Sequence, residues 1–319
     1  MALKFFNPAH LRDQYRWNSF VREPTILQLF TGKRDVLQCL APRDEFSVPF
    51  SNLGLTLNIP FAYYAVELAS CDVNSLILAD SWTAIQKLDA FRVMCRAVQR
   101  IHARRVVHRD LKPSNFLVMP DGSLRLSDFG TARDLNNDAI ARAYHAPPGD
   151  VGYAAPEMIA SLHDVDPSFA LAGDIYSLGA ILFELFARTP LVLHLFDTAT
   201  LGDLHQTMAR VDRTARVRTY GAFVTNLANG HPLPSLRHFG GTVPACALPL
   251  IDRLYQGMAA VDYNQRLSDF NTIFSLISTC IWVLQHEDAY NRWRAFRERM
   301  REKRETKRPK SEPTNNISH

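Results

Sequence analysis

The sequence is poor in cysteine and has no glycine before Gly32. The five cysteines among its 319 residues are scattered, and none forms a C-x-x-C pair. No secretory pattern precedes them, so we expect reduced thiols in the cytosol or nucleus, with neither disulfides nor a structural zinc site. The five are Cys39, Cys71, Cys95, Cys246 and Cys280.

The sequence also has little that could cross a membrane. The segment from Phe169 to Phe196 is mostly apolar, but Asp174, Glu184 and Arg188 interrupt it. Charges at these positions favour a helix buried in a protein core over a membrane span. With 47% hydrophobic residues, the chain can bury one large core or two lobes. We therefore expect a globular protein with no membrane span.

Positive charge is concentrated near one end of the sequence. The net charge is +4, and residues 292–310 carry ten Lys or Arg against three Glu, a net of +7 that leaves −3 for the rest. We expect a helix end that passes into a basic, disordered tail over 291–319. A nuclear localisation signal and a site for an anionic partner are the alternatives. Elsewhere the sequence shows no nucleic-acid-binding signature.

The segment from Val107 to Gly130 holds two short polar motifs joined by a predicted hairpin. Two apolar runs, Phe116–Met119 and Leu124–Leu126, predict strands, and the Pro and Gly of the turn between them favour a tight reversal. Because Asn115 enters the first strand and Asp128 leaves the second, we expect both side chains at the same end of the hairpin.

These motifs resemble the catalytic loop and the metal-binding turn of eukaryotic protein kinases. The matching residues are His108-Arg109-Asp110-Leu111 with Asn115, and Asp128-Phe129-Gly130. The segment DLKPSN resembles the serine/threonine class. Either tripeptide alone could be a chance match, but the joint spacing and the hairpin argue against chance.

The resemblance implies a role for each polar residue. Asp110 would accept the proton of the substrate hydroxyl, and Lys112 would steady the γ-phosphate of ATP. Asn115 and Asp128 would ligate Mg²⁺ through hard oxygen ligands. Catalysis would then come from alignment and charge neutralisation around the transferred phosphoryl group.

Two upstream residues resemble the lysine and glutamate that hold the α- and β-phosphates in kinases. Lys4 lies in the segment MALKFF, and Glu23 follows nineteen positions later in REPTILQLF, which resembles helix αC. The alternative is an unstructured lysine and a solvated helix charge. Pro24 would be tolerated in a first helical turn but would kink a helix interior.

The strand predicted at Phe61–Val66 continues into Glu67-Leu68-Ala69, which resembles the hinge between kinase lobes. The resemblance implies that the backbone of Glu67 and Ala69 would meet the adenine edge. Val66 would be the gatekeeper residue, and Leu117 would form the floor of the nucleotide pocket. An ordinary buried strand is the alternative. A further strand is predicted over residues 36–40.

The rest of the sequence resembles the larger lobe of a kinase. Apolar residues recur at helical intervals between Trp82 and Arg104. By the resemblance, Glu157 and Arg266 would form a buried ion pair, and Asp174 would hydrogen-bond the catalytic-loop backbone.

We therefore expect an α+β, two-lobed kinase-like fold with a reduced N-lobe, a short antiparallel sheet plus αC, and a mainly helical C-lobe. The expected divisions are an N-lobe over 1–66, a hinge over 67–72, a C-lobe over 73–290 and the tail over 291–319. Residues 189–247 form an insertion in which Leu191–Val211 is predicted helical and Thr219–Pro244 is predicted to be a long loop, a candidate docking site for a partner.

Three features depart from the kinase pattern. Only three residues precede Lys4, which leaves no room for the strands and Gly-rich turn that cover the ATP phosphates. We expect a sequence truncated before that turn, an incomplete version of a longer kinase; a short form that acts as a scaffold is the alternative. Asp150 stands where these kinases usually have a threonine, and would attract Lys112 and repel Asp110. The loop from Thr131 to Asp150 has no central Ser or Thr for activating phosphorylation, so Arg109 is expected to pair with a fixed carboxylate such as Asp138, or with nothing.

The expected function is transfer of the ATP γ-phosphate to serine or threonine hydroxyls of protein substrates, with ATP and Mg²⁺ as cofactors. The alternative is a pseudokinase-like interaction protein with weak or no ATP turnover. A small-molecule kinase is disfavoured because the segment Ala155-Pro156-Glu157 resembles the peptide-binding platform of protein kinases.

Overall fold

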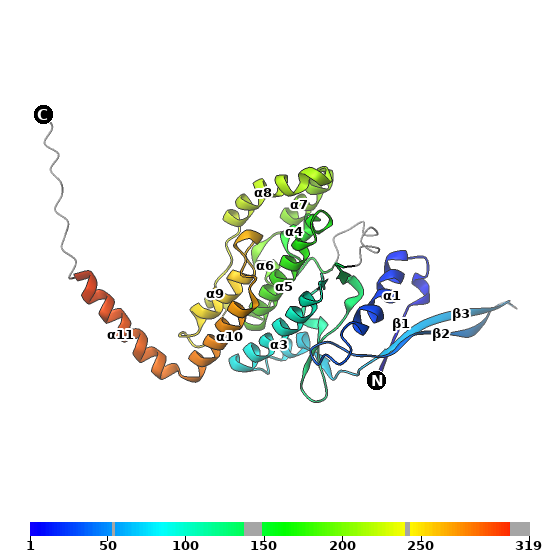
Figure 1. Cartoon of the computed structure of the whole chain (residues 1–319), viewed down its shortest axis with the longest axis horizontal. Helices are drawn as coiled ribbons and strands as arrows, with labels where there is room; N and C mark the ends of the chain where they lie inside the picture. Colours follow the sequence, from blue (N-terminus) through cyan, green and yellow to red (C-terminus); the bar gives the residue numbers. More distant parts are fainter. Residues whose placement is uncertain (53–54, 137–148, 240–242, 307–319) are drawn as a thin grey trace.

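The computed structural model describes residues 1–52, 55–136, 149–239 and 243–306. A twisted three-stranded sheet and helix α1 lie on one side of the molecule, and a larger helical body lies on the other (Figure 1). This two-part α+β arrangement confirms the fold class expected from the sequence. The first part contains β1 (Ala2–Phe5), η1 (Pro8–His10), α1 (Gln14–Gln28), β2 (Cys39–Asn52) and β3 (Leu55–Val66).

The sheet has the order β1–β3–β2, and both pairings are antiparallel. β2 begins at Cys39, later than the predicted strand over 36–40, and Val36 makes only an isolated bridge to Leu126. β2 nevertheless runs to Asn52 although it contains Pro42 and Pro49. An edge strand tolerates proline because one row of its backbone groups needs no partner, and register shifts between Cys39 and Asp44 absorb the irregularity.

Helix α1 packs its inner face against this sheet. The Asp13 side chain accepts a hydrogen bond from the Arg16 N–H and caps the first turn. Phe20 contacts Tyr64 of β3 with ring centroids 5.1 Å apart, and the buried face also carries Glu23. Pro24 lies inside this helix rather than in its first turn.

The helical body is built around α5 (Ser168–Ala187), which is buried along nearly its whole length. Among the described helices α5 is long and apolar enough to cross a membrane, but 89% of that apolar window is buried inside the protein. Gly179 of α5 allows close approach to the end of α9 (Leu248–Met258), because a Cβ there would lie 2.6 Å from the nitrogen of Ala259, the residue that follows α9. The apolar character of this segment is therefore that of a core helix.

Short strands and helices connect the sheet to the helical core. The amphipathic helix predicted between Trp82 and Arg104 is α3, which starts at a capping box formed by Thr83 and Gln86. The elements are β4 (Cys71–Asp72), α2 (Val73–Ala79), α3 (Ala84–Ala103), β5 (Val106–Val107), η2 (Pro113–Asn115), β6 (Phe116–Val118), β7 (Leu124–Leu126), η3 (Phe129–Thr131) and β8 (Arg133–Asp134).

The remaining helices complete the body and include two corrections to the sequence prediction. The loop predicted over Thr219–Pro244 is wrong up to Gly230, because α8 buries Tyr220, Val224 and Leu227 along one face. A disordered tail was expected over 291–319, but residues 291–306 belong to α11, and 307–319 lie outside the described residues. The helices are α4 (Pro156–Ile159), η5 (Leu162–Asp164), α6 (Val192–Leu195), α7 (Thr198–Arg210), α8 (Arg213–Gly230), η6 (Leu236–Phe239), α9 (Leu248–Met258), η7 (Tyr263–Gln265), α10 (Phe270–Gln285) and α11 (Glu287–Thr306).

The five cysteine thiols are free in the structure. Cys95, Cys246 and Cys280 are buried, whereas Cys39 and Cys71 are partly exposed.

Candidate functional site

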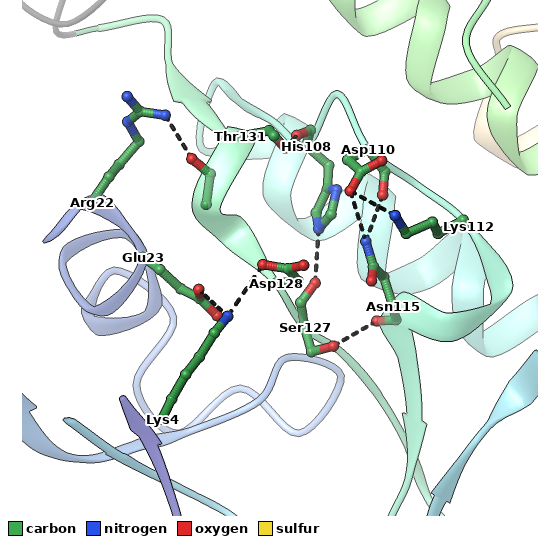
Figure 2. A network of polar contacts seen from close by, with 11 residues as sticks. Lys4, Arg22, Glu23, His108, Asp110, Lys112, Asn115, Ser127, Asp128 and Thr131 are labelled. Atoms are coloured by element: carbon green, nitrogen blue, oxygen red, sulfur yellow. Dashed lines mark hydrogen bonds and ion pairs between the residues drawn. The ribbon is translucent and has the colours of Figure 1, made fainter. Parts of the chain in front are cut away.

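The hairpin of β6 and β7 brings the two polar motifs to one end, as the sequence predicts. Phe116 pairs with Leu126 in its register. The Ser127 N–H and hydroxyl both donate to the Asn115 carbonyl, each at 2.9 Å, and the His108 ring lies 2.9 Å from the Ser127 carbonyl. Asp128 follows directly, so it lies beside the loop that carries Asp110 and Asn115 (Figure 2).

The backbone of the loop that carries Asp110 is held by Asp174 of α5. The Asp174 residue is only 1% exposed. The two carboxylate oxygens of Asp174 accept the backbone N–H groups of His108 and Arg109, each at 2.8 Å. His102 adds a contact of 2.9 Å. Burial opposes ionisation of Asp174, but these donors outweigh it and lower the pKa of Asp174.

Asp110 is surrounded by donors on three sides. Its Oδ1 accepts the Asp150 N–H at 2.7 Å, and its Oδ2 lies 3.2 Å from Lys112 Nζ and 3.3 Å from Asn115 Nδ2. Asn115 Nδ2 also donates to the Asp110 carbonyl at 2.7 Å. The Asp110 side chain is only 10% exposed, so its orientation is fixed before any substrate arrives.

Asp150 meets Asp110 through its backbone, which sequence reasoning missed. The expected attraction to Lys112 is present but long, with 3.7 Å between Lys112 Nζ and Asp150 Oδ2. The other carboxylate oxygen accepts the Gly152 N–H at 2.9 Å. The side chain thus turns toward Gly152 and Lys112 while its N–H supports Asp110. No side-chain pattern in the sequence signals a backbone donor.

Gly149 permits this approach. Its φ is +88°, and a Cβ built there would lie 2.2 Å from the Arg109 carbonyl oxygen. Glycine is the residue that both adopts positive φ readily and leaves space for a passing backbone. The contact between residues 149–150 and the loop of Asp110 therefore depends on the absence of a side chain.

Lys4, Glu23 and Asp128 form a second charged group on the opposite side of the site. Lys4 Nζ lies 2.5 Å from Glu23 Oε2 and 3.3 Å from Asp128 Oδ1. Burial alone would lower the pKa of Lys4, but the two carboxylates outweigh it and raise that pKa. Burial raises the pKa of Glu23, and Lys4 offsets part of this rise. The predicted Lys4–Glu23 pairing is present in the structure.

Phe129 fixes the turn that follows Asp128. Its ring is fully buried, with its centroid 5.0 Å from that of His108 and 6.1 Å from that of Phe30. Arg22 of α1 donates to the Gly130 carbonyl at 2.7 Å. Asp128 itself has φ +60°, so packing on both sides holds an uncommon backbone conformation.

Arg109 and Glu157, two charged residues near the site, are held by hydrogen bonds within the protein. The Arg109 guanidinium donates to the Thr131 carbonyl at 2.8 and 2.5 Å, and Asp138, its expected partner, lies outside the described residues. Arg266 forms the expected bidentate pair with Glu157, and both side chains are essentially unexposed.

The chain matches the family described as "Protein kinase domain" over residues 1–279. This protein belongs to the protein kinase family. It is 30% identical over 264 residues to mitogen-activated protein kinase mpkA of Aspergillus fumigatus, which covers 78% of this chain and 56% of that protein. It is 33% identical over 202 residues to mitogen-activated protein kinase 12 of rice, covering 60% of this chain and 33% of the relative. The matches thus span about half or less of these relatives' own length.

The segment predicted to be the hinge is ordered by the side chain of Glu67. Its carboxylate accepts the Gln38 N–H at 2.9 Å and lies 3.1 Å from Arg125 Nη1. The Glu67 N–H donates to the Gln38 carbonyl at 3.2 Å. Ala69 and Leu117 are both partly exposed. The predicted contacts of Glu67, Ala69 and Leu117 with adenine stay predictions.

The donor set suits Mg²⁺. Because the Asn115 amide nitrogen is committed to Asp110, its oxygen is left as the ligand atom. Lys4, His108 and Lys112 outweigh burial and lower the pKa of Asp128, which keeps this carboxylate anionic. Carboxylate and amide oxygens are hard ligands of the kind that Mg²⁺ prefers. A bound ion would supply positive charge that neutralises phosphate oxygens.

Proposed function

We propose that this kinase domain transfers the γ-phosphoryl group of ATP to serine or threonine hydroxyls of protein substrates. The observation that carries the proposal is the convergence of Asp110, Lys112 and Asn115 with Asp128 and the Lys4–Glu23 pair at one site (Figure 2). Phosphoryl transfer needs alignment and preorganised charge more than covalent chemistry, and these groups are already oriented.

Each residue has a role in the proposed transfer. Asp110 accepts the proton of the substrate hydroxyl. The hydroxyl oxygen bonds to the γ-phosphorus as the bond between that phosphorus and ADP breaks. Lys112, whose pKa is raised because the Asp110 and Asp150 carboxylates outweigh burial, stays cationic beside the γ-phosphate. Lys4 holds the α- and β-phosphates, and Asn115 and Asp128 hold Mg²⁺.

The finer assignments extend this proposal. Glu67 and Ala69 present their backbone to adenine, and Leu117 lies under the ring. The protein acts in the cytosol or nucleus. The segment over 189–247, which contains α6, α7 and α8, is a docking site for a protein partner.

A nucleotide-binding domain with little turnover is the second candidate. In the described sheet β1 is an edge strand, and the Lys4 side chain on it is 43% exposed. Water at Lys4 would weaken its hold on phosphate oxygens. This candidate shares the binding residues of the first and differs only in rate.

The test is phosphate incorporation into a generic protein substrate from labelled Mg-ATP by the 319-residue chain and its Asp110→Asn variant. We expect a loss of about 10²–10⁴-fold in rate with Mg-ATP affinity kept. Asp89→Asn, an exposed change on α3, is the matched control and should leave the rate unchanged. Equal labelling by wild type and Asp110→Asn, with Mg-ATP still bound, would reject turnover and support the second candidate.

A further inference from the structure

Helix α11 lies outside the residues that match the kinase family and carries an exposed apolar stripe. It projects away from the helical body beyond α10 (Figure 1). Trp293, Phe296 and Met300 are 51%, 56% and 40% exposed. Their spacing of three and four residues puts them on one side of the helix. Large apolar side chains gathered on a projecting helix indicate a surface that another partner covers.

Arginines border this stripe on both sides. Arg292 and Arg299 fall along one border of Phe296, and Arg297 falls along the other border beside Trp293. The Arg297 guanidinium lies over the Trp293 ring, 5.0 Å from its centroid. Cations placed at the edges of an apolar stripe can reach negative groups while the stripe itself is buried.

The opposite side of the helix has a different composition. Asp288, Asn291 and Ala295 recur there at helical spacing. Positive charge is therefore directed toward the same side as the apolar residues. The partner must combine an apolar interior with negative charge and must contact α11 from one side only. An acidic protein groove that surrounds a helix would also meet Asp288, whereas a flat surface would not.

We propose that α11 lies along the surface of a bilayer containing anionic phospholipids. Trp293, Phe296 and Met300 enter the boundary between headgroups and acyl chains, and the bordering arginines contact lipid phosphates. The sequence supplies further cations, since residues 292–310 carry ten Lys or Arg against three Glu. This proposal is independent of phosphoryl transfer.

The experiment measures partition of the 319-residue chain onto vesicles. Wild-type protein is sedimented with phosphatidylcholine vesicles and with vesicles that contain about 30% phosphatidylserine. The anionic lipid gives the second set a negative surface potential. We expect strong preference for the anionic vesicles, at least about tenfold, and a loss of most binding as salt screens the charges. Duplex DNA and a calcium-loaded protein whose acidic groove binds amphipathic helices serve as competing ligands.

Two variants separate the apolar and the charged contributions. The triple change Trp293→Ser, Phe296→Ser, Met300→Ser should lower the partition coefficient at least tenfold, and so should Arg292→Gln, Arg297→Gln, Arg299→Gln. The matched control on the opposite side, Asp288→Ser, Asn291→Ser, Ala295→Ser, should bind as the wild type does. A blue-shifted fluorescence component on vesicle binding that disappears in Trp293→Phe would show insertion of this ring.

Several results would overturn the proposal. These are equal binding to neutral and anionic vesicles, no binding to either, or full binding by the apolar triple variant, which would indicate charge attraction alone. Tighter binding to DNA or to the acidic groove protein than to anionic vesicles would assign α11 to that partner instead.

Discussion

The two charged groups of the site are supported very differently. Asp110 stands on a loop whose backbone is bonded to Asp174, a residue buried in the central helix of the body. Lys4 stands on β1, the edge strand of a small sheet, with a side chain 43% exposed. The residues proposed to act at the γ-phosphate therefore have a rigid support, whereas the lysine proposed to hold the other phosphates has a lighter one.

This difference separates stability from function. Loss of Asp174 removes a buried carboxylate that is hydrogen-bonded through both oxygens, and this should destabilise the whole fold. Loss of Lys4 removes a half-exposed ammonium that water can replace. Both changes should reduce phosphoryl transfer, but only the first should reduce the free energy of unfolding by much.

Asp174→Ala should have the largest effect on stability. It leaves the N–H groups of His108 and Arg109 buried without acceptors, and we expect a loss of about 3–5 kcal/mol in the free energy of unfolding. Urea denaturation followed by circular dichroism measures it. Asp174→Asn keeps only one acceptor oxygen and turns an NH2 donor toward the other N–H, so it should also destabilise the fold; wild-type stability in Asp174→Ala would contradict the proposed role of the two N–H bonds.

Gly149→Ala should come next. Its Cβ would overlap the Arg109 carbonyl at a residue with φ +88°, so we expect about 2–3 kcal/mol of destabilisation. Phosphate transfer should fall at least about tenfold because the Asp150 N–H moves off Asp110.

Gly122→Ala is the matched control for Gly149→Ala. Gly122 also has positive φ, +79°, but a Cβ there meets nothing within 4 Å. It should cost about 1 kcal/mol with activity retained. Equal activity losses in both variants would show that backbone conformation, and not the contact with Arg109, is responsible.

The helical body should also be sensitive to acid through His163 of η5. Burial, with Arg109, Arg133 and Arg216 nearby, lowers the pKa of His163 to about 3. The unfolded chain binds a proton at this residue below about pH 6.5 whereas the folded chain does not. Its contribution to stability is therefore complete above that pH and is lost as the pH falls, by about 2 kcal/mol between pH 6.5 and 5.

Urea midpoints measured across this pH window, for wild type and His163→Gln, check the expectation. The variant should show a shallower decline in the free energy of unfolding. Parallel pH profiles would assign the acid sensitivity to other groups.

Lys4→Met should have the smallest effect on stability, about 1 kcal/mol, because the side chain is half exposed and Glu23 can take up a proton in its absence. Mg-ATP affinity should nevertheless fall, by about tenfold, because a phosphate contact is lost. Isothermal titration with Mg-ATP measures this. If Lys4→Met kept its affinity for Mg-ATP but lost much of its stability, Lys4 would be a structural residue like Asp174, and the difference drawn between the two charged groups would be wrong.

Much of the site was accessible from the sequence because its residues lie at short, fixed spacings. The hairpin predicted over Phe116–Met119 and Leu124–Leu126 matches β6 and β7 within one residue. Such a turn fixes where Asn115 and Asp128 emerge. The pairs Lys4–Glu23 and Glu157–Arg266 were predicted from the family resemblance, and their contacts are present.

Other features depend on backbone position and tertiary packing. The bond from the Asp150 N–H to Asp110 depends on how two distant segments meet. The helical part of Thr219–Pro244 was missed because the prolines of the segment, which all lie after Gly230, led to a loop prediction for the whole of it, although Tyr220, Val224 and Leu227 already had helical spacing. β2 extends through two prolines because its outer edge has no strand partner in the described sheet.

The support that Asp110 receives from residue 150 comes from a peptide N–H, which every amino acid except proline provides. The side chain at that position is therefore not needed to hold the Asp110 carboxylate. Substitutions at residue 150 other than proline should therefore leave the bond to Asp110 in place, whereas any side chain at residue 149 would collide with the Arg109 carbonyl. The aspartate found here, where the family resemblance leads one to expect threonine, is compatible with this support.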